Sequence, residues 1–280
     1  MWGWSAATRA ASAAPYRWGV INLLPPTTSA QLWNPILLAV SRLSGLRLAL
    51  AMAPSTPKAV ERAGAGEYDF FVNNHLFTPE RQRWGWRVIA RFNVQTQGSL
   101  WVRTPGPAQR LTDLHGLPVA FPSPEAFFGY HLPMRALSAA GVTVQERFAG
   151  PVDAVMAQLA SGAAAAAGGN LAVARRYARL HQLPVQPLWV SEPYPDFAVM
   201  VNPQVTPEAA QRVRQALLDL RADAQGAAAL DAMQAALWPT LEEPLRFIAA
   251  TDADYEPYVQ FWRQFAVTKK PAASAAPGSR

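Results

Sequence analysis

Polar side chains without a fixed charge follow several predicted strands of this 280-residue chain. Asn73, Asn74 and His75 come directly after an apolar run, and they offer amide and imidazole donors and acceptors. Such groups suit the orientation of a polar ligand. Taking the strand ends together, we predict ligand contacts from Asn22, Thr28, Asn73, His75, Ser123, Phe127, Tyr130, Asn170 and Glu192.

Two histidines are candidates for a metal site. His75 and His131, with Tyr130 and Glu192 as further ligands, have suitable chemistry, but the chain lacks the H-x-x-H spacing that indicates metal binding directly. A lone histidine in a turn more often has a structural role. The sequence therefore predicts neither a metal nor another cofactor, and leaves His75 and His131 as the residues to check.

Large aromatic residues occupy a strand-to-helix turn, where small polar residues are usual. The segment VAFPSPEAFFGYHLPMRAL (119–137) places Phe127 and Phe128 directly before a predicted helix. Phe127 fits equally well as a pocket wall or as core, whereas core packing is favoured for Phe128. Further along, Gly168 and Gly169 lack the spacing of a phosphate loop, and we predict that they let the backbone approach a ligand.

Composition excludes several classes of protein. Half of the residues are hydrophobic and 16% are charged, which indicates a globular chain long enough for two lobes. The net charge of +6 comes from scattered residues, so we predict no nucleic-acid binding and a weak preference for a small anion. With no cysteine, disulfides and thiolate sites are excluded. No run reaches the roughly 18 apolar residues of a spanning helix, so any membrane association is peripheral.

Predicted strands alternate with predicted helices along the chain. Strands are expected at 16–24, 46–53, 68–72, 86–93, 99–104, 118–121, 142–148, 184–193 and 197–203, with a small-residue strand and turn at 163–170, and helices at 30–44, 57–65, 130–140, 151–161, 171–180 and 207–220. This alternation predicts an α/β fold with mainly parallel sheets. Ligands of such sheets bind beyond the carboxyl ends of the strands.

The middle of the chain carries a family pattern. The segments DLHG, LPVAFPSP, EAFFGYHLPMRAL, SGAAAAAGGN and SEPYPDFAVMV, in this order, resemble the phosphonate and phosphite class of periplasmic solute-binding proteins of ABC importers. The resemblance extends from about Tyr16 to Leu220. The matching landmarks are Leu111, Asp113, Leu114, Gly116, Val119, Ala120, Phe121, Pro124, Gly129, Tyr130 and Pro133.

The resemblance implies a two-lobed periplasmic-binding-protein-like fold, a periplasmic location, an ABC permease as partner and no catalysis. Each lobe is expected to be a mainly parallel sheet flanked by helices, and the lobes close on a small molecule or small anion. Hinges are expected near Arg103–Pro105 and Val199–Pro203. The expected division is residues 16–104 with 201–267 for lobe 1, 105–200 for lobe 2, and disordered or processed ends at 1–15 and 268–280.

The departures from the family pattern concern the ligand. Where the family has hydroxyl side chains on the phosphonate oxygens, this chain has Ala126, Phe127 and Phe128, and two acidic positions become Ala165 and Asn170. A doubly charged phosphonate needs several donors once it is desolvated. We therefore expect a ligand other than a simple phosphonate.

Two further classes of protein stay open. A sensor that signals to a membrane histidine kinase would have the same fold and would also close on its ligand. An enzyme is disfavoured because the chain has no G-x-S-x-G, H-E-x-x-H or Walker motif, although catalytic groups need no local motif.

Overall fold

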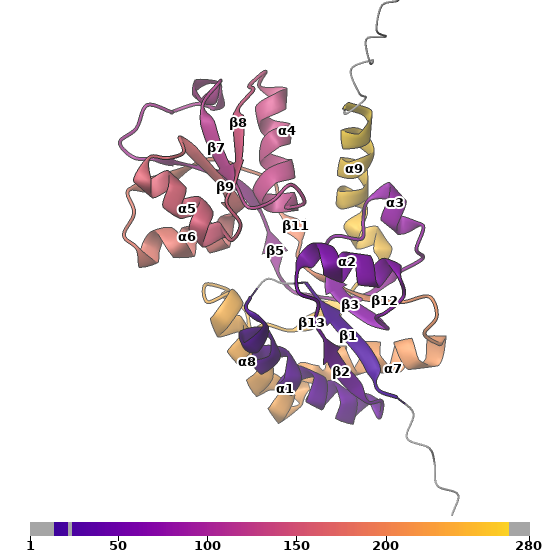
Figure 1. Cartoon of the computed structure of the whole chain (residues 1–280). Helices are drawn as coiled ribbons and strands as arrows, with labels where there is room; N and C mark the ends of the chain where they lie inside the picture. Colours follow the sequence, from indigo (N-terminus) through magenta and orange to yellow (C-terminus); the bar gives the residue numbers. More distant parts are fainter. Residues whose placement is uncertain (1–13, 22–23, 269–280) are drawn as a thin grey trace, which may run out of the picture. The chain divides into compact units, whose positions relative to one another are not determined.

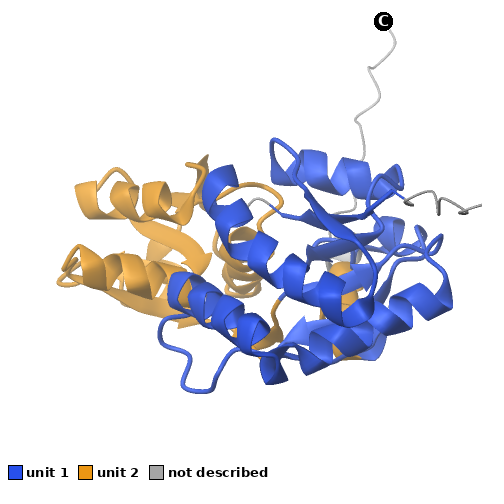
Figure 2. Cartoon of the chain, turned by 90° about the horizontal axis from the view of Figure 1, so that it is seen from below, with its two compact units in different colours: residues 1–92, 197–253 blue, residues 93–196, 254–280 orange. Residues whose placement is uncertain are grey.

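The chain divides into two compact units, which are coloured separately in Figure 2. The structure is a computed structural model that describes residues 14–21 and 24–268. Unit 1 comprises residues 1–92 and 197–253, and unit 2 comprises residues 93–196 and 254–280. Each unit has its own sheet flanked by helices, so the prediction of a two-lobed α/β fold is confirmed.

Unit 1 is built on a six-stranded mixed sheet. Its elements are β1 (Tyr16–Val20), α1 (Pro26–Ser44), β2 (Leu48–Ala51), α2 (Thr56–Gly64), β3 (Phe70–Asn73), α3 (Pro79–Gln82), β4 (Arg87–Phe92), β12 (Ala198–Val201), α7 (Pro207–Asp219), η3 (Leu220–Ala222), α8 (Ala224–Leu237) and β13 (Phe247–Ala249). The strand order is β13-β4-β12-β3-β1-β2, and Figure 1 labels all of these strands except β4. β1 pairs with β2 and β3 in parallel, whereas β12 lies antiparallel between β3 and β4, and β13 pairs antiparallel with β4.

Helix α1 covers part of this sheet. It begins at Pro26, four residues before the predicted start at Ala30, because proline fits the first turn of a helix, where its missing N–H has no partner to lose. Trp33, Ile36 and Val40 recur at helical spacing and are buried, and the helix packs against β2, α7 and α8. It ends at Gly45, whose φ of 66° lies in the left-handed region.

Unit 2 has a separate five-stranded sheet in the order β10-β6-β9-β7-β8. Its elements are β5 (Gln95–Thr96), β6 (Gly98–Arg103), η1 (Leu111–Leu114), β7 (Pro118–Phe121), η2 (Phe127–His131), α4 (Leu132–Ala139), β8 (Gln145–Phe148), α5 (Val152–Ser161), β9 (Ala166–Asn170), α6 (Leu171–Leu180), β10 (Val185–Val190), β11 (Tyr194–Pro195) and α9 (Glu256–Thr268); η4 (Asp252–Tyr255) lies at the junction of the two units. β7 pairs with β8 and β9 in parallel, and β6 pairs antiparallel with β9 and β10. Both large sheets are thus mixed, with parallel pairs among β1, β2 and β3 and among β7, β8 and β9.

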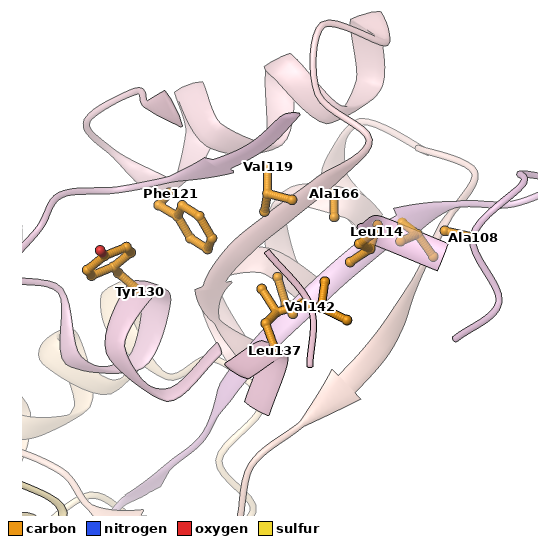
Figure 3. Packing of buried hydrophobic residues seen from close by; sticks show 10 residues of the cluster. Ala108, Leu114, Val119, Phe121, Tyr130, Leu137, Val142 and Ala166 are labelled. Carbon is orange, nitrogen blue, oxygen red and sulfur yellow. The ribbon is translucent and has the colours of Figure 1, made fainter. Parts of the chain in front are cut away.

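Alternate residues along the strands of unit 2 belong to two hydrophobic cores, as the period of two in a strand requires. Leu100 and Val119 belong to one buried cluster, which Figure 3 shows from close by. Their neighbours Trp101 and Ala120 belong to the other. Both faces of the sheet are therefore covered.

The unit boundaries differ from the predicted lobe boundaries. The sequence assigns residues 98–103 to the first lobe, but they form β6, which pairs with β9 and β10 in unit 2. The chain passes between units after residues 92, 196 and 253. The predicted hinge near Arg103–Pro105 therefore lies at the end of β6, inside unit 2. The predicted hinge near Val199–Pro203 overlaps β12, inside unit 1. Neither lies where the chain passes between the units.

Helix α9 groups with unit 2, whereas the sequence places all C-terminal helices in the first lobe. The hydroxyl of Tyr255 donates to the carbonyl oxygen of Asp196 at 2.7 Å. The hydroxyl of Tyr258 donates to the carbonyl oxygen of Pro195, also at 2.7 Å. Helices α7 and α8 do lie in unit 1.

The ends predicted to be disordered or processed, 1–15 and 268–280, lie outside the described residues except for 14, 15 and 268. Within the described ranges, no helix is long and apolar enough to cross a membrane.

Candidate functional site

The candidates of unit 1 lie where β1 and β3 end. These strands are parallel neighbours, so Thr28 in the first turn of α1, Asn73 at the end of β3 and His75 just after it lie at the same edge of the sheet. Asn22, the remaining candidate of this unit, falls outside the described residues.

The side-chain amide of Asn73 forms hydrogen bonds to the backbone of its own turn. This residue is fully buried, and its Oδ1 accepts from the backbone N–H of His75 at 2.9 Å and of Leu76 at 3.0 Å. Its Nδ2 donates to the carbonyl oxygen of Phe71 at 3.3 Å. The tertiary structure thus gives Asn73 a defined role in shaping the loop that carries the half-buried His75.

Five candidates of unit 2 also lie at one edge of a sheet. Ser123, Phe127 and Tyr130 follow β7, and Asn170 ends the parallel neighbour β9. Glu192 follows β10 close to the same edge, since Ser191 N–H donates to Gly98 O, and Gly98 pairs with Asn170. Within each unit, the structure thus places the described candidate residues at one edge of the sheet.

The two phenylalanines of the turn after β7 are buried, and they pack against aromatic residues. The ring of Phe127 stacks on Tyr258 at 4.5 Å between centroids, and it meets Phe261 of α9 at 4.9 Å and Tyr194 at 5.2 Å. Phe128 meets Tyr194 at 6.2 Å. Both rings belong to a core that joins the turn to α9.

Tyr130 is bonded within the same unit. Its hydroxyl donates to Glu146 Oε2 of β8 at 2.7 Å, and its ring packs edge-on to Phe121 at 5.2 Å. Burial, followed by the hydrogen bond to Glu146, raises the pKa of Tyr130 above its usual value. The phenol therefore remains a protonated donor at neutral pH.

Gly168 of β9 allows a close approach between two backbone segments, whereas the sequence analysis predicts that a ligand approaches the glycines of this strand. A Cβ at Gly168 would collide with the carbonyl oxygen of Gly129 and would lie 2.7 Å from the ring of Phe121. A Cβ at Gly169 would make ordinary contacts, the shortest at 3.4 Å to Val152. Gly168 thus lets η2 pack onto β9.

Asn170 and Glu192 have partners of their own. Asn170 is the N-cap of α6, and its Oδ1 accepts from the backbone N–H of Ala172 at 3.0 Å and of Val173 at 3.3 Å. Glu192 is largely exposed and pairs with Arg135 at 3.3 Å.

We expect Asn170→Ala to lower the free energy of unfolding by about 1 kcal/mol, because the first turn of α6 loses its cap. Asn170→Asp keeps an accepting oxygen and should retain most of the stability. Urea unfolding of the two variants checks this, and equal losses in both would contradict the capping role.

Neither candidate histidine is part of a metal cluster in the structure. Among the described residues, no group of three or more His, Asp or Glu side chains is placed to hold a metal ion. His131 is buried, and its ring lies edge-on to Trp262 at 4.6 Å.

A hollow that sequence reasoning missed opens in unit 1 at the strand ends. It contains about 400 Å³ of empty space, part of it open to solvent. Residues from five separate stretches line it, namely Val20, Ile21, Leu24, Ser29, Leu32, Trp33, Val72, Phe92, Phe197, Met233, Leu237 and Trp238. No local motif signals this set, because α8 brings its last residues from far along the chain.

A family model described as an ABC transporter, phosphonate, periplasmic substrate-binding protein matches residues 19–255, which is most of the chain. The chain belongs to this family. The phosphonate-binding family consists of solute-binding proteins and not of enzymes, so the prediction that the chain is not an enzyme is confirmed.

Solved structures of low sequence identity share the fold. A binding-protein component of an ABC phosphonate transporter from Pseudomonas aeruginosa has a TM-score of 0.74 at 16% identity, covering 94% of this chain and 91% of that one. PhnD1 from Prochlorococcus marinus, in complex with methylphosphonate, has a TM-score of 0.71 at 17% identity, covering 90% and 98%. A Xanthomonas citri protein bound to ATP has a TM-score of 0.75 at 15% identity, covering 91% and 99%. A comparison with curated protein sequences finds no match.

This phosphonate-family chain is thus a periplasmic-type substrate-binding component of an ABC transporter. The ligands held by the solved relatives belong to those proteins, and identities of 15–17% support only the shared fold.

Proposed function

We propose that the protein works in the periplasm, captures a small solute for import through an ABC permease, and does not use a simple phosphonate as that solute. The family membership supports the transport role. The restriction on the solute depends on the turn after β7.

The decisive observation is the packing of Phe127 and Phe128. The resemblance places phosphonate-binding hydroxyls at this turn, and here two buried rings occupy it. Within residues 126–131, the one hydroxyl is that of Tyr130, which donates its proton to Glu146. A desolvated dianion would meet no hydroxyl in this stretch other than the one bonded to Glu146, and the carboxylate of Glu146 would repel it.

We further propose that His75, Ser123 and Thr28 contribute polar contacts to the solute. Each lies close after the end of a strand, at the edge of the sheet where ligands of α/β proteins bind. The other residues of the proposed ligand site are Asn22, Asn73, Phe127, Tyr130, Asn170 and Glu192. Those among them that are buried shape the site.

We expect methylphosphonate or phosphate at millimolar concentration to leave the melting midpoint of the purified protein unchanged. A ligand that binds the native state raises the midpoint by mass action, so thermal shift detects it directly. A clear rise with either anion would show that backbone amides replace the missing hydroxyls, and it would refute the restriction on the solute.

Transport itself is tested by native mass spectrometry of the protein isolated from the periplasm of its host. The expected result is a mass increment from a bound small molecule, released on denaturation. A protein that binds no component of a broad solute panel and carries no ligand would contradict the proposed function. No observation favours a histidine kinase as partner over a permease.

A further inference from the structure

The hollow of unit 1 lies at the edge where ligands of α/β sheets bind. β1, β3 and β4 all end there with Val20, Val72 and Phe92 at the hollow, and β12, which runs antiparallel to β3, begins there after Phe197. Helix α1 forms one wall and the end of α8 forms another. The position is that of a ligand site by the general rule for such sheets.

The lining has the wrong chemistry for an anion. Among the described residues, it contains no charged side chain, and its one polar side chain is Ser29. The hydroxyl of Ser29 already donates to the carbonyl oxygen of Leu24 at 3.2 Å. An anion placed here would lose its water and gain few donors, whereas an apolar group would lose nothing.

Four of the lining side chains are aromatic. The rings of Trp33 and Phe92 are 6.1 Å apart at 48°, and those of Phe92 and Trp238 are 5.3 Å apart at 54°. Phe197 completes the set. Tilted rings present both faces and edges to the hollow, and a further ring packs favourably against such a surface.

We propose that this hollow binds an aromatic ring of the transported solute, whose polar end remains at the mouth. The proposal rests on the solute-binding function proposed above and adds the chemical class of the solute. The hollow is partly open to solvent, so a ring can enter it from the mouth while the polar end of the same solute stays hydrated. Full burial of a phenyl group favours binding by about 10- to 100-fold.

The test uses pairs of probes with the same head group, phenylphosphonate against methylphosphonate and benzoate against acetate. We expect the ring-bearing member of at least one pair to raise the melting midpoint, by about 5 °C at about 100 times its dissociation constant, while its methyl partner has no effect. Tryptophan emission should change with the same probes, because Trp33 and Trp238 line the hollow.

Two variants on the same helix locate the binding. Leu32→Trp adds a large side chain inside the hollow, and Leu38→Trp adds the same side chain at a position of α1 that is 68% exposed. The ring-dependent shift should disappear in Leu32→Trp and persist in Leu38→Trp. Should Leu32→Trp fail to fold, Leu237→Trp fills the hollow from α8.

Two outcomes overturn the proposal. One is a ring-dependent shift that is equal in wild type and in the filled variants, because the ring then binds elsewhere. The other is the absence of any ring-dependent shift in the wild type. In both cases a solute seen by native mass spectrometry, or a shift with a non-aromatic solute, would leave the transport function standing. The failure of both experiments would remove that function as well.

Discussion

Gly168→Ala should be among the most destabilising single substitutions in unit 2, with an expected loss of about 3 kcal/mol in the free energy of unfolding. The added methyl group would collide with the carbonyl oxygen of Gly129 and the ring of Phe121. A carbonyl oxygen belongs to the backbone and cannot rotate away as a side chain does. The turn η2 and the strand β9 would have to separate.

The neighbouring glycine provides the control for this effect. Gly169→Ala places the methyl group in ordinary contact with Val152 at 3.4 Å, and it lowers the entropy of the unfolded chain. We therefore expect no loss, or a small gain, in stability. Urea unfolding followed by circular dichroism compares the two, and similar losses at both positions would show that the close approach of Gly168 is not what matters.

Phe127→Ala should cost about 3 to 5 kcal/mol, the range for removing a buried ring from a core. The variant loses the stack on Tyr258 and the edge contacts to Phe261 and Tyr194. Because Tyr258 and Phe261 belong to α9, we also expect faster amide hydrogen exchange in that helix. These losses should appear without any ligand.

Phe148→Ala is the matched control, since this ring of the same unit is 45% exposed and lies on the edge strand β8. It should cost much less and leave the exchange of α9 unchanged. If Phe127 were instead a pocket wall with free space beside it, the two variants would lose similar stability and only Phe127→Ala would alter ligand binding.

The interpretation of Phe127 shows where sequence reasoning stopped. From the residues alone, a pocket wall and a core position were equally good, because both require a large apolar side chain. The partner that decides between them, α9, follows more than 120 residues later and groups with the second unit. Nothing in the local pattern of residues 119–137 contains that contact.

The glycines of β9 also show that the sequence pattern does not identify the partner of a close contact. Small residues in a strand indicate that something comes close, and the sequence did not say what. A ligand was predicted, and the structure places the backbone of η2 there.

The sequence by itself determined the α/β class, the order of the main elements as far as α7 and the strand ends that carry polar residues. These features depend on local physics, namely the periodicity of apolar residues, the turn residues and the cap at Asn170. It also carried the family pattern, which the match over residues 19–255 bears out.

Only the tertiary structure decided which sheet receives each strand and which residues share a cavity. β6 follows β4 closely in the chain but pairs in the other sheet, and β12 inserts antiparallel between β3 and β4. The aromatic hollow requires Trp33, Phe92 and Trp238 to meet, although some 60 to 200 residues separate them along the chain. Contacts between residues so far apart are selected by burial of the whole core, and no local spacing of residue types encodes them.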